Sequence, residues 1–443
     1  MFFAQLRQIL SLALPMLVAQ VSSMGMMIID TMLLGHYSTE DLAAVAIGSG
    51  IYIAVLFALV GVVQAVAPVV AHYKGAAREA EIGEALSQSF WLAAGLSVPC
   101  VWMIGHPQAF FALTTMSPTV EAKVLAYLGV LAWGVPAALF YRAIYAFCSA
   151  LGEPRVLMRI ALAGTVLHGL LAWLLVGGRA GLPALGGVGC ALSNAAVNWF
   201  VLACGLAYLR VSPKFSGYRL LRDWVPPRLA VQRELLRLGI PMGMSYFVEV
   251  SSFTLVALLA AELGSVAVSG HRIVANLAAL CYMLPLALAM ATLSQVGIAA
   301  GAGDALRART SALAGCVLAG GLSTLMGALL WLGKVPVVSA YSNDPAVCAV
   351  AVSLIVYLAL YQLFDAVQTV AAFALRGYRV TFVPMLVHIV CFWGVGLFGG
   401  WWLAFRAATP LGLAGFWLAA LSGLVLAAVL LGGLLWRVAR RAD

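Results

Sequence analysis

Long apolar runs, separated by short polar breaks, make up nearly the whole sequence. At about 1.5 Å per helical residue, each run is long enough to cross the roughly 30 Å hydrocarbon core of a bilayer. The pattern therefore predicts an all-α integral membrane protein. Twelve transmembrane helices are expected, at residues 8–34, 42–72, 86–106, 122–150, 155–177, 185–209, 233–261, 266–300, 307–333, 345–375, 381–405 and 411–436.

Several of these runs are longer than a bilayer requires, so we expect tilted or bent helices. Proline removes a backbone donor and clashes with the preceding turn, which makes it a common bend point. The prolines inside the runs that we expect to bend their helices are Pro15, Pro136, Pro241, Pro285 and Pro384.

Composition excludes a water-soluble fold. Hydrophobic residues make up 64% of the 443 residues and charged residues 9%, whereas soluble domains average about 45–50% and about 25%. The net charge of +9 would suit nucleic acid, but nineteen Lys and Arg fall in the breaks on one side and five on the other. The positive-inside rule explains this asymmetry and places both termini in the cytoplasm. No nucleic-acid partner is expected.

The two halves of the chain show signs of duplication. Leu14-Pro15-Met16 corresponds to Ile240-Pro241-Met242 at an offset of 226, and landmarks at the ends of two later helices repeat at 226 and 225. Six helices per repeat predict two six-helix lobes related by a pseudo-two-fold axis along the membrane normal. The expected division is an N-lobe at 1–209, a basic cytoplasmic linker at 210–232 that would also suit anionic lipid headgroups, and a C-lobe at 233–443.

The tenth predicted helix carries an acid, Asp365, inside an apolar run. A carboxylate near the bilayer centre costs about 3 kcal/mol, so it needs a partner, a cavity or a proton. Helical spacing puts Tyr361, Gln368 and Thr369 on the same face. These residues predict one polar stripe on that helix.

A second acid, Glu249, lies in the seventh predicted helix. Glu249 is 12 residues from Arg237 and Asp365 is 11 residues from Arg376, which puts both about 17 Å from the cytoplasmic edge. Two acids at one depth repel each other, and a proton or Na⁺ would relieve that repulsion. We expect a coupling site here, with Tyr361 nearby; the alternative is two separate acids that stay protonated.

Asp30 is the acid of the first predicted helix and is expected nearer the outer surface. Methionines such as Met27 surround it with soft apolar surface that suits an organic cation. The alternative is a helix-end acid in water. His168 and His271 are interpreted as hydrogen-bonded packing residues, with a proton relay as the alternative, and Arg142 needs a partner that the sequence does not name. The eight cysteines occur singly and are interpreted as small buried hydrophobes.

Several stretches together resemble the multidrug and toxic compound extrusion (MATE) transporters, nearest to the bacterial NorM-like branch, over essentially the full length. They are Asp30-Thr31-Met32-Leu33-Leu34-Gly35 followed by Asp41-Leu42-Ala43-Ala44-Val45-Ala46, Phe247-Val248-Glu249-Val250, Met283-Leu284-Pro285, and Tyr361-Gln362-Leu363-Phe364-Asp365 followed by Leu375-Arg376-Gly377-Tyr378. The resemblance implies an inner-membrane antiporter that exports cationic, amphipathic compounds in exchange for Na⁺ or H⁺, with no other cofactor.

By motif, the resemblance implies that Glu249 and Asp365 form the C-lobe cation site, including Na⁺ ligation if Na⁺ is the coupling ion, and that Asp30 is the N-lobe acid. Family members often have paired Asn residues in the fifth helix, where this chain has His168 and Ala172. This departure puts amide coordination in the N-lobe in doubt and favours protons, although the coupling ion stays undecided. The expected partners are organic cations, the coupling ion and membrane lipids, with the protein a monomer.

Two other functions compete with this interpretation. A lipid or lipid-linked-sugar flippase could share the two-lobe architecture, but an anionic pyrophosphate would call for basic residues in the cleft, and only Arg142 is clearly intramembrane. An intramembrane enzyme or a scaffold is the other alternative. The sequence has no G-x-x-x-x-G-K-[ST], H-E-x-x-H or G-x-S-x-G motif, so we expect no enzyme.

Overall fold

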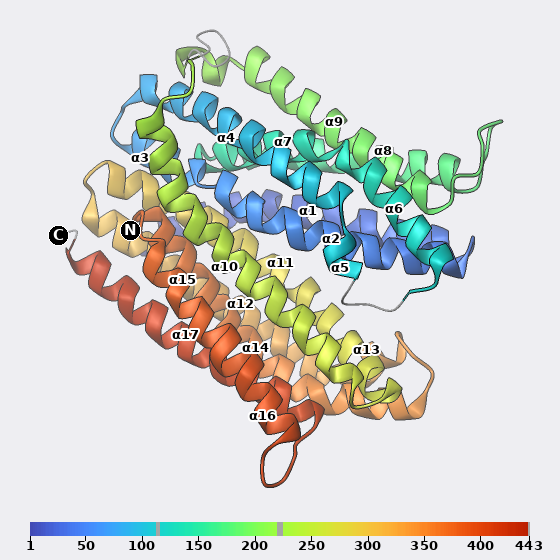
Figure 1. The fold of residues 1–443 in the computed structure, drawn as a ribbon. Helices are drawn as coiled ribbons and strands as arrows, with labels where there is room; N and C mark the ends of the chain where they lie inside the picture. The colour runs from blue at the N-terminus through green and yellow to red at the C-terminus, as the bar shows by residue number, and fades with distance from the viewer. Residues whose placement is uncertain (112–115, 219–224, 442–443) are drawn as a thin grey trace. The chain divides into compact units, whose positions relative to one another are not determined.

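The computed structural model describes residues 1–111, 116–218 and 225–441. The regular secondary structure of these ranges is entirely helical, without a strand (Figure 1). The α-helices are α1 (Phe2–Gly35), α2 (Thr39–Val63), α3 (Val66–Gly75), α4 (Glu79–Gly105), α5 (Gln108–Phe111), α6 (Pro118–Ala132), α7 (Val135–Ala150), α8 (Pro154–Val176), α9 (Gly187–Val211), α10 (Leu229–Ala261), α11 (Ser265–Gly301), α12 (Ala305–Leu332), α13 (Lys334–Ser339), α14 (Pro345–Gly377), α15 (Phe382–His388), α16 (Gly399–Phe405) and α17 (Leu413–Arg441). A short 3₁₀-helix, η1 (Pro213–Tyr218), follows α9, and a π-helix, η2 (Ile389–Phe398), joins α15 to α16.

The predicted number of membrane spans agrees with these helices. Within the described residues, eleven helical segments are long and apolar enough to cross a bilayer, and α6 with α7 form one further bent pair. Counting that pair as one span gives twelve. The observed ends extend past several predicted ones; α4, for example, begins at Glu79 rather than residue 86. Acidic residues in a first helical turn favour the helix N-terminus, so polar residues outside the apolar run still belong to the helix.

Contacts between residues divide the chain into two compact units. The N-unit comprises Val18–Tyr73 and Arg78–Gly243, and the C-unit comprises Met1–Leu17, Lys74–Ala77 and Met244–Asp443. Two helices change unit along their length: α1 does so two residues after Pro15, and α10 does so two residues after Pro241. These are the two prolines that the sequence places at equivalent positions of the repeats.

In the N-unit, α8 and α9 lie side by side, and α9 also packs against α6 and α7 (Figure 1). The bend expected at Pro136 is confirmed, because α6 and α7 meet at 50° just before it. Gly134 stands at this break, and a Cβ there would lie 2.9 Å from the Cα of Ala195 on α9. Glycine therefore lets the bent pair sit directly on the neighbouring helix.

In the C-unit, α14 is the central helix and packs against α11, α12 and α17. It begins at Pro345, where the carboxylate of Asp344 caps the helix by accepting a hydrogen bond from the Ala346 N–H at 2.8 Å. A Cβ on Gly327 of α12 would lie 2.5 Å from the carbonyl oxygen of Ala359. Small residues of this kind let membrane helices approach closely.

The eleventh span has a π-helical middle, which the sequence did not predict. One backbone group and one side chain of this segment bond to α10: the hydroxyl of Ser252 donates to the carbonyl of Phe392 at 3.2 Å, and the indole of Trp393 donates to the Ser251 hydroxyl at 3.0 Å. Such π-helical segments occur frequently at functional sites. Here the segment borders the helix that carries Glu249.

The predicted linker 210–232 contains η1 and the start of α10, while residues 219–224 lie outside the described residues. The end of the linker that leads into α10 is hydrogen-bonded to α4. The amide of Gln88 donates to the carbonyl of Pro226 at 2.8 Å and accepts from the backbone N–H of Arg228 at 2.9 Å. The indole of Trp91 donates to the carbonyl of Val225 at 3.0 Å.

Candidate functional site

The polar stripe predicted on α14 is buried in the C-unit. Tyr361, Asp365, Gln368 and Thr369 are each less than 5% exposed. The side-chain amide of Gln368 donates to Asp365 Oδ1 at 3.1 Å and to Thr369 Oγ1 at 2.9 Å. His388 on α15 bonds to Gln368 Oε1 through Nε2 at 3.2 Å. Helical spacing predicted this stripe correctly, but it gave no sign of His388, which belongs to another helix.

Glu249 approaches this stripe from α10. It is close enough to Asp365 for the two carboxyl groups to interact electrostatically, and it accepts a hydrogen bond from the hydroxyl of Tyr282 on α11. The phenols of Tyr282 and Tyr361 both lie within the electrostatic reach of both acids. The structure therefore brings together Glu249, Asp365 and Tyr361 and adds Tyr282, which sequence reasoning missed because nothing in its own segment marks it.

Arg376, from which the depth of Asp365 is predicted, lies in the last turn of α14, and its side chain is only 4% exposed. Its guanidinium lies over the rings of Phe373 and Tyr246, at 4.1 Å and 5.1 Å, and donates to the Tyr246 hydroxyl at 3.3 Å. Its positive charge also acts on Glu249. The depth of Asp365 in the membrane stays a prediction, whereas the electrostatic interaction between Glu249 and Asp365 shows that the two acids are neighbours.

Aromatic rings form one side of the acidic site. The ring of Tyr361 lies 6.5 Å from that of Phe253 and 6.2 Å from that of Trp417, both near edge-to-face. The imidazole of His271, 5.8 Å from Trp417, continues this cluster. Such rings present negative faces to an organic cation. The site thus combines carboxylates with aromatic surface.

Gln362 is a buried polar residue three positions before Asp365. Its side chain is 1% exposed, and neither its amide nitrogen nor its amide oxygen has a hydrogen-bond partner among the described residues. An unpaired buried amide is costly and uncommon, so it calls for an explanation such as a bound ion or water.

The N-unit holds the other predicted acid, in different surroundings. Asp30 of α1 is 9% exposed, which excludes the alternative of a helix-end acid in water. Its Oδ1 lies 2.9 Å from Nε2 of His168 on α8, and Nδ1 of His168 lies 3.0 Å from the Ser193 hydroxyl on α9. Met27, one turn before Asp30, is 48% exposed. Sequence reasoning named Asp30 and His168 separately and did not connect them.

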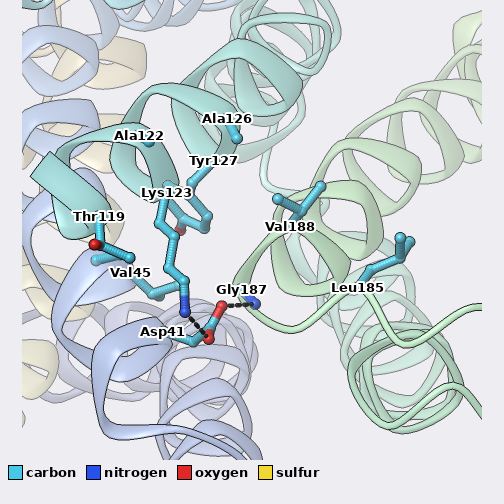
Figure 2. Close-up of a pocket in the computed structure, with 11 residues that line it drawn as sticks. Asp41, Val45, Thr119, Ala122, Lys123, Ala126, Tyr127, Leu185, Gly187 and Val188 are labelled. Atoms are coloured by element: carbon cyan, nitrogen blue, oxygen red, sulfur yellow. Dashed lines mark hydrogen bonds and ion pairs between the residues drawn. The ribbon is translucent and has the colours of Figure 1, made fainter.

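Asp41, from a motif of the family resemblance, takes part in a third polar cluster (Figure 2). Its Oδ2 lies 2.7 Å from Nζ of Lys123 on α6, and its Oδ1 accepts the backbone N–H of Gly187 at 3.0 Å, at the start of α9. Glu40 also reaches Lys123, at 3.1 Å. These contacts border a cavity of about 360 Å³ lined by α2, α6 and α9. Asp41 thus joins the ends of three helices, and Lys123 stabilises this junction through its ion pair with Asp41.

Sequence and structure comparisons show the family and the fold. A model of the MatE family matches twice, at residues 15–174 and 241–402, which reproduces the offset of 226 inferred from the two prolines. Probable multidrug resistance protein NorM from Aromatoleum aromaticum is 54% identical over 97% of this chain and 93% of its own length. Multidrug resistance protein MdtK from Pectobacterium atrosepticum is 35% identical over 97% of this chain and 95% of its own.

Solved structures of similar fold include a eukaryotic MATE transporter, AtDTX14, with a TM-score of 0.90, 20% identity, and coverage of 100% of this chain and 98% of the other. An outward-facing multidrug resistance MATE transporter of the MOP superfamily has a TM-score of 0.89, 18% identity, and coverage of 99% and 96%. At these low sequence identities the structural similarity shows only a shared fold. Membership of a family is shown by the family model and by the relatives of higher sequence identity. The chain is a multi-pass membrane transporter, not an enzyme, and it belongs to the MATE family.

Proposed function

We propose that this chain is a secondary antiporter that exports cationic, amphipathic drugs and toxic compounds in exchange for Na⁺ or H⁺ by alternating access. One observation carries the proposal: Glu249, which is partly buried, and Asp365, which is 3% exposed, come from different helices and interact in one site of the C-unit. Intramembrane acids of this kind mark ion and substrate pathways. The related proteins from Aromatoleum and Pectobacterium are both described as multidrug resistance proteins, which supports drugs as the class of substrate.

The coupling step follows from the charges. Two neighbouring carboxylates repel each other in a buried site, so one cation stabilises them together. Na⁺ would find carboxylate oxygens from both acids and the unpaired amide oxygen of Gln362, all of which are hard oxygen donors of the kind such a cation prefers. A proton would need only one of the acids. Either ion removes one of the two negative charges and favours a different conformation from the one that an organic cation favours.

Substrate binding has two candidate positions. In the C-unit, a cation could use Glu249 and Asp365 with the rings of Tyr361 and Trp417 beside them. In the N-unit, Asp30 supplies the charge and the half-exposed Met27 supplies adaptable apolar contact. Asp30, Met27, Glu249 and Asp365 are therefore assigned to substrate. Glu249 and Asp365 are also assigned to the coupling ion, together with Tyr361.

The membrane placement is part of the same proposal. The asymmetry of nineteen against five basic residues supports a cytoplasmic location for both termini. The bacterial relatives support assignment to the inner membrane of a bacterium. The protein is assigned as a monomer, with lipid headgroups at the basic linker as its other contacts.

A flippase for lipid-linked sugars is the second candidate function. The buried Arg376 is the observation that favours it, because a pyrophosphate needs a basic partner. However, its guanidinium already bonds to Tyr246 and its charge acts on Glu249. The guanidinium of Arg376 thus already has partners within the protein and does not need a pyrophosphate. The antiporter is therefore the better-supported function.

Transport by purified protein in liposomes tests the proposal. Ethidium efflux is measured with a Na⁺ gradient or a pH gradient imposed separately, and a lipid-linked sugar serves as the rival substrate. Glu249→Gln and Asp365→Asn are expected to abolish gradient-driven efflux. Glu262→Gln, an exposed acid of the same unit, is the matched control and is expected to keep it. Efflux by both site variants at the wild-type rate, or transport of the lipid-linked sugar alone, would overturn the antiporter.

A further inference from the structure

Two arginines from different helices of the C-unit share one indole ring. The guanidinium of Arg309 on α12 and that of Arg440 on α17 each lie 4.4 Å from the ring centre of Trp436. Trp436 stands one turn before Arg440 on α17 and is 45% exposed. Two positive charges are therefore held close together at the surface, and a tryptophan with this exposure is typical of the membrane–water interface.

Packing between α12, α14 and α17 holds these side chains in place. Ala312 of α12 and Leu431 and Leu435 of α17 are buried in one apolar cluster with Leu375 of α14. One face of α17 is thus covered by its neighbours, while the opposite face, with the indole and the guanidinium of its last turns, is exposed. The paired arginines are therefore part of a packed helix end and not of a loop.

The arginines at this end of the C-unit have no acidic partner in the part of the chain that the structure describes. Neither an ion pair nor a side-chain hydrogen bond is made by the guanidinium of Arg309, Arg437, Arg440 or Arg441. Several basic residues of the N-unit, in contrast, pair with a glutamate: Arg78, Lys214 and Arg228. Unpaired guanidiniums that lie close together repel one another, so an anion bound among them would be stabilised.

Exposed apolar side chains continue from the two arginines along both helices. On α12, Leu313 and Val317 follow Arg309 at intervals of four residues, which puts all three on one face, and they are 52% and 51% exposed. On α17, Val429 lies two turns before Trp436 and is 65% exposed. Because α12 begins and α17 ends here, both apolar faces extend in the same direction, away from the charges. A positive site above apolar surface suits a ligand with an anionic head and hydrocarbon chains.

We propose that Arg309, Trp436 and Arg440 form a binding site for an anionic phospholipid. Its phosphate pairs with the two guanidiniums, whose planar forks match phosphate oxygens, and its acyl chains lie along the apolar faces of α12 and α17. The predicted orientation puts this end at the cytoplasmic leaflet, where anionic lipids are enriched. The site is separate from the basic linker. A lipid bound here holds together α12 and α17, which both pack against α14, the helix that carries Asp365.

Equilibrium binding of a phosphatidylglycerol with a fluorescent acyl chain tests this site. The full-length protein is purified in a neutral detergent, and fluorescence polarisation follows competition by unlabelled phosphatidylglycerol, phosphatidylcholine or glycerol phosphate. Phosphatidylglycerol is expected to compete at least about tenfold better than phosphatidylcholine, because choline cancels the charge of the phosphate. Glycerol phosphate carries the charge without the chains and should compete at least about 100-fold less well than phosphatidylglycerol.

The Arg309→Gln/Arg440→Gln variant is expected to bind phosphatidylglycerol at least about tenfold more weakly, since each arginine near an anionic headgroup contributes roughly fivefold. Arg155→Gln/Arg159→Gln is the matched control, because it removes two exposed arginines one turn apart on α8 of the N-unit; its affinity should stay within about twofold of the wild type. Arg440→Gln alone, at the exposed end of α17, should lose about fivefold and replaces the double variant if that does not fold. Phosphatidylglycerol should raise the melting temperature of the wild type and the control, but not of the double variant.

Three results would contradict the lipid site, whichever compound the protein transports. Equal losses in the site variant and in the control would show that lipid is attracted by surface charge in general. Equal competition by phosphatidylglycerol and phosphatidylcholine would show that the site does not select an anionic head. Displacement by glycerol phosphate at the concentration at which phosphatidylglycerol acts would identify a free phosphate as the ligand instead.

Discussion

The two acid sites of this chain differ although they belong to the two copies of one repeat. In the C-unit, Asp365 lies among an amide, hydroxyls and a second carboxyl group, so it meets oxygen-rich partners. In the N-unit, Asp30 bonds to the imidazole of His168. The first environment can accept a metal cation or a proton, and the second suits a proton or an organic cation. Similar acids in a duplicated fold thus need not bind the same ligand.

The repeat alignment explains how this difference is possible. At the offset of 226, Asp30 corresponds to Val256, and at the offset of 225, Asp365 corresponds to Phe140. Neither acid has an acidic counterpart in the other copy. The duplication therefore preserved the prolines and the helix order, while each copy acquired its own chemistry. This comparison makes separate predictions for the two sites.

The largest effect is expected from Asp365→Asn. It keeps the size of the side chain but removes the charge that pairs with the coupling ion, and the amide retains a carbonyl oxygen for Gln368. We expect gradient-driven ethidium efflux in liposomes to fall about 100-fold, near the upper range of a typical coupling free energy, with binding of the drug reduced much less. Efflux within twofold of the wild type would show that the C-unit acids do not carry coupling.

A smaller effect, about tenfold, is expected from His168→Gln in the otherwise unchanged protein. Because glutamine cannot take up a proton, efflux driven by a pH gradient should slow, whereas any Na⁺-driven component should persist through Glu249 and Asp365. The measurement is the ratio of the two rates in the same liposomes. An equal loss of both components would indicate that His168 supports the fold of the N-unit rather than its chemistry.

Most of the fold, and the acid of each site, could be predicted from the sequence, whereas most of the residues that contact these acids could not. Apolar runs located the spans, and helical spacing identified the stripe of Asp365, because both are local properties of the chain. The partners Tyr282, His388 and His168 come from other helices, and which helices meet is decided by packing between distant segments. Arg376 shows the same limit: its position at a helix end can be predicted from the sequence, but the ring of Tyr246 that covers its guanidinium comes from another helix.

A smaller change is expected where α2, α6 and α9 meet (Figure 2). Asp41→Ala leaves the Gly187 N–H without its acceptor and removes one of the two carboxylates of Lys123, which keeps Glu40, whereas Lys123→Ala leaves Asp41 bonded to Gly187. The melting temperature should therefore fall more for Asp41→Ala, by about 4 °C, than for Lys123→Ala, by about 2 °C. Thermal unfolding of the purified protein measures this order. The reverse order would show that the bond to Gly187 does not hold α9.

The smallest effect on stability, and the sharpest contrast between the two sites, is expected from Gln362→Leu. In the N-unit every bond of the acid's cluster can be made, but in the C-unit both polar atoms of Gln362 are buried without a partner among the described residues. Leucine of similar size removes that unpaired amide, so the melting temperature should stay equal or rise by about 2 °C. Sodium-driven efflux should nevertheless slow severalfold if the amide oxygen contributes to the ion. A loss of stability with unchanged transport would show instead that Gln362 is bonded within the protein and has no part in holding the ion.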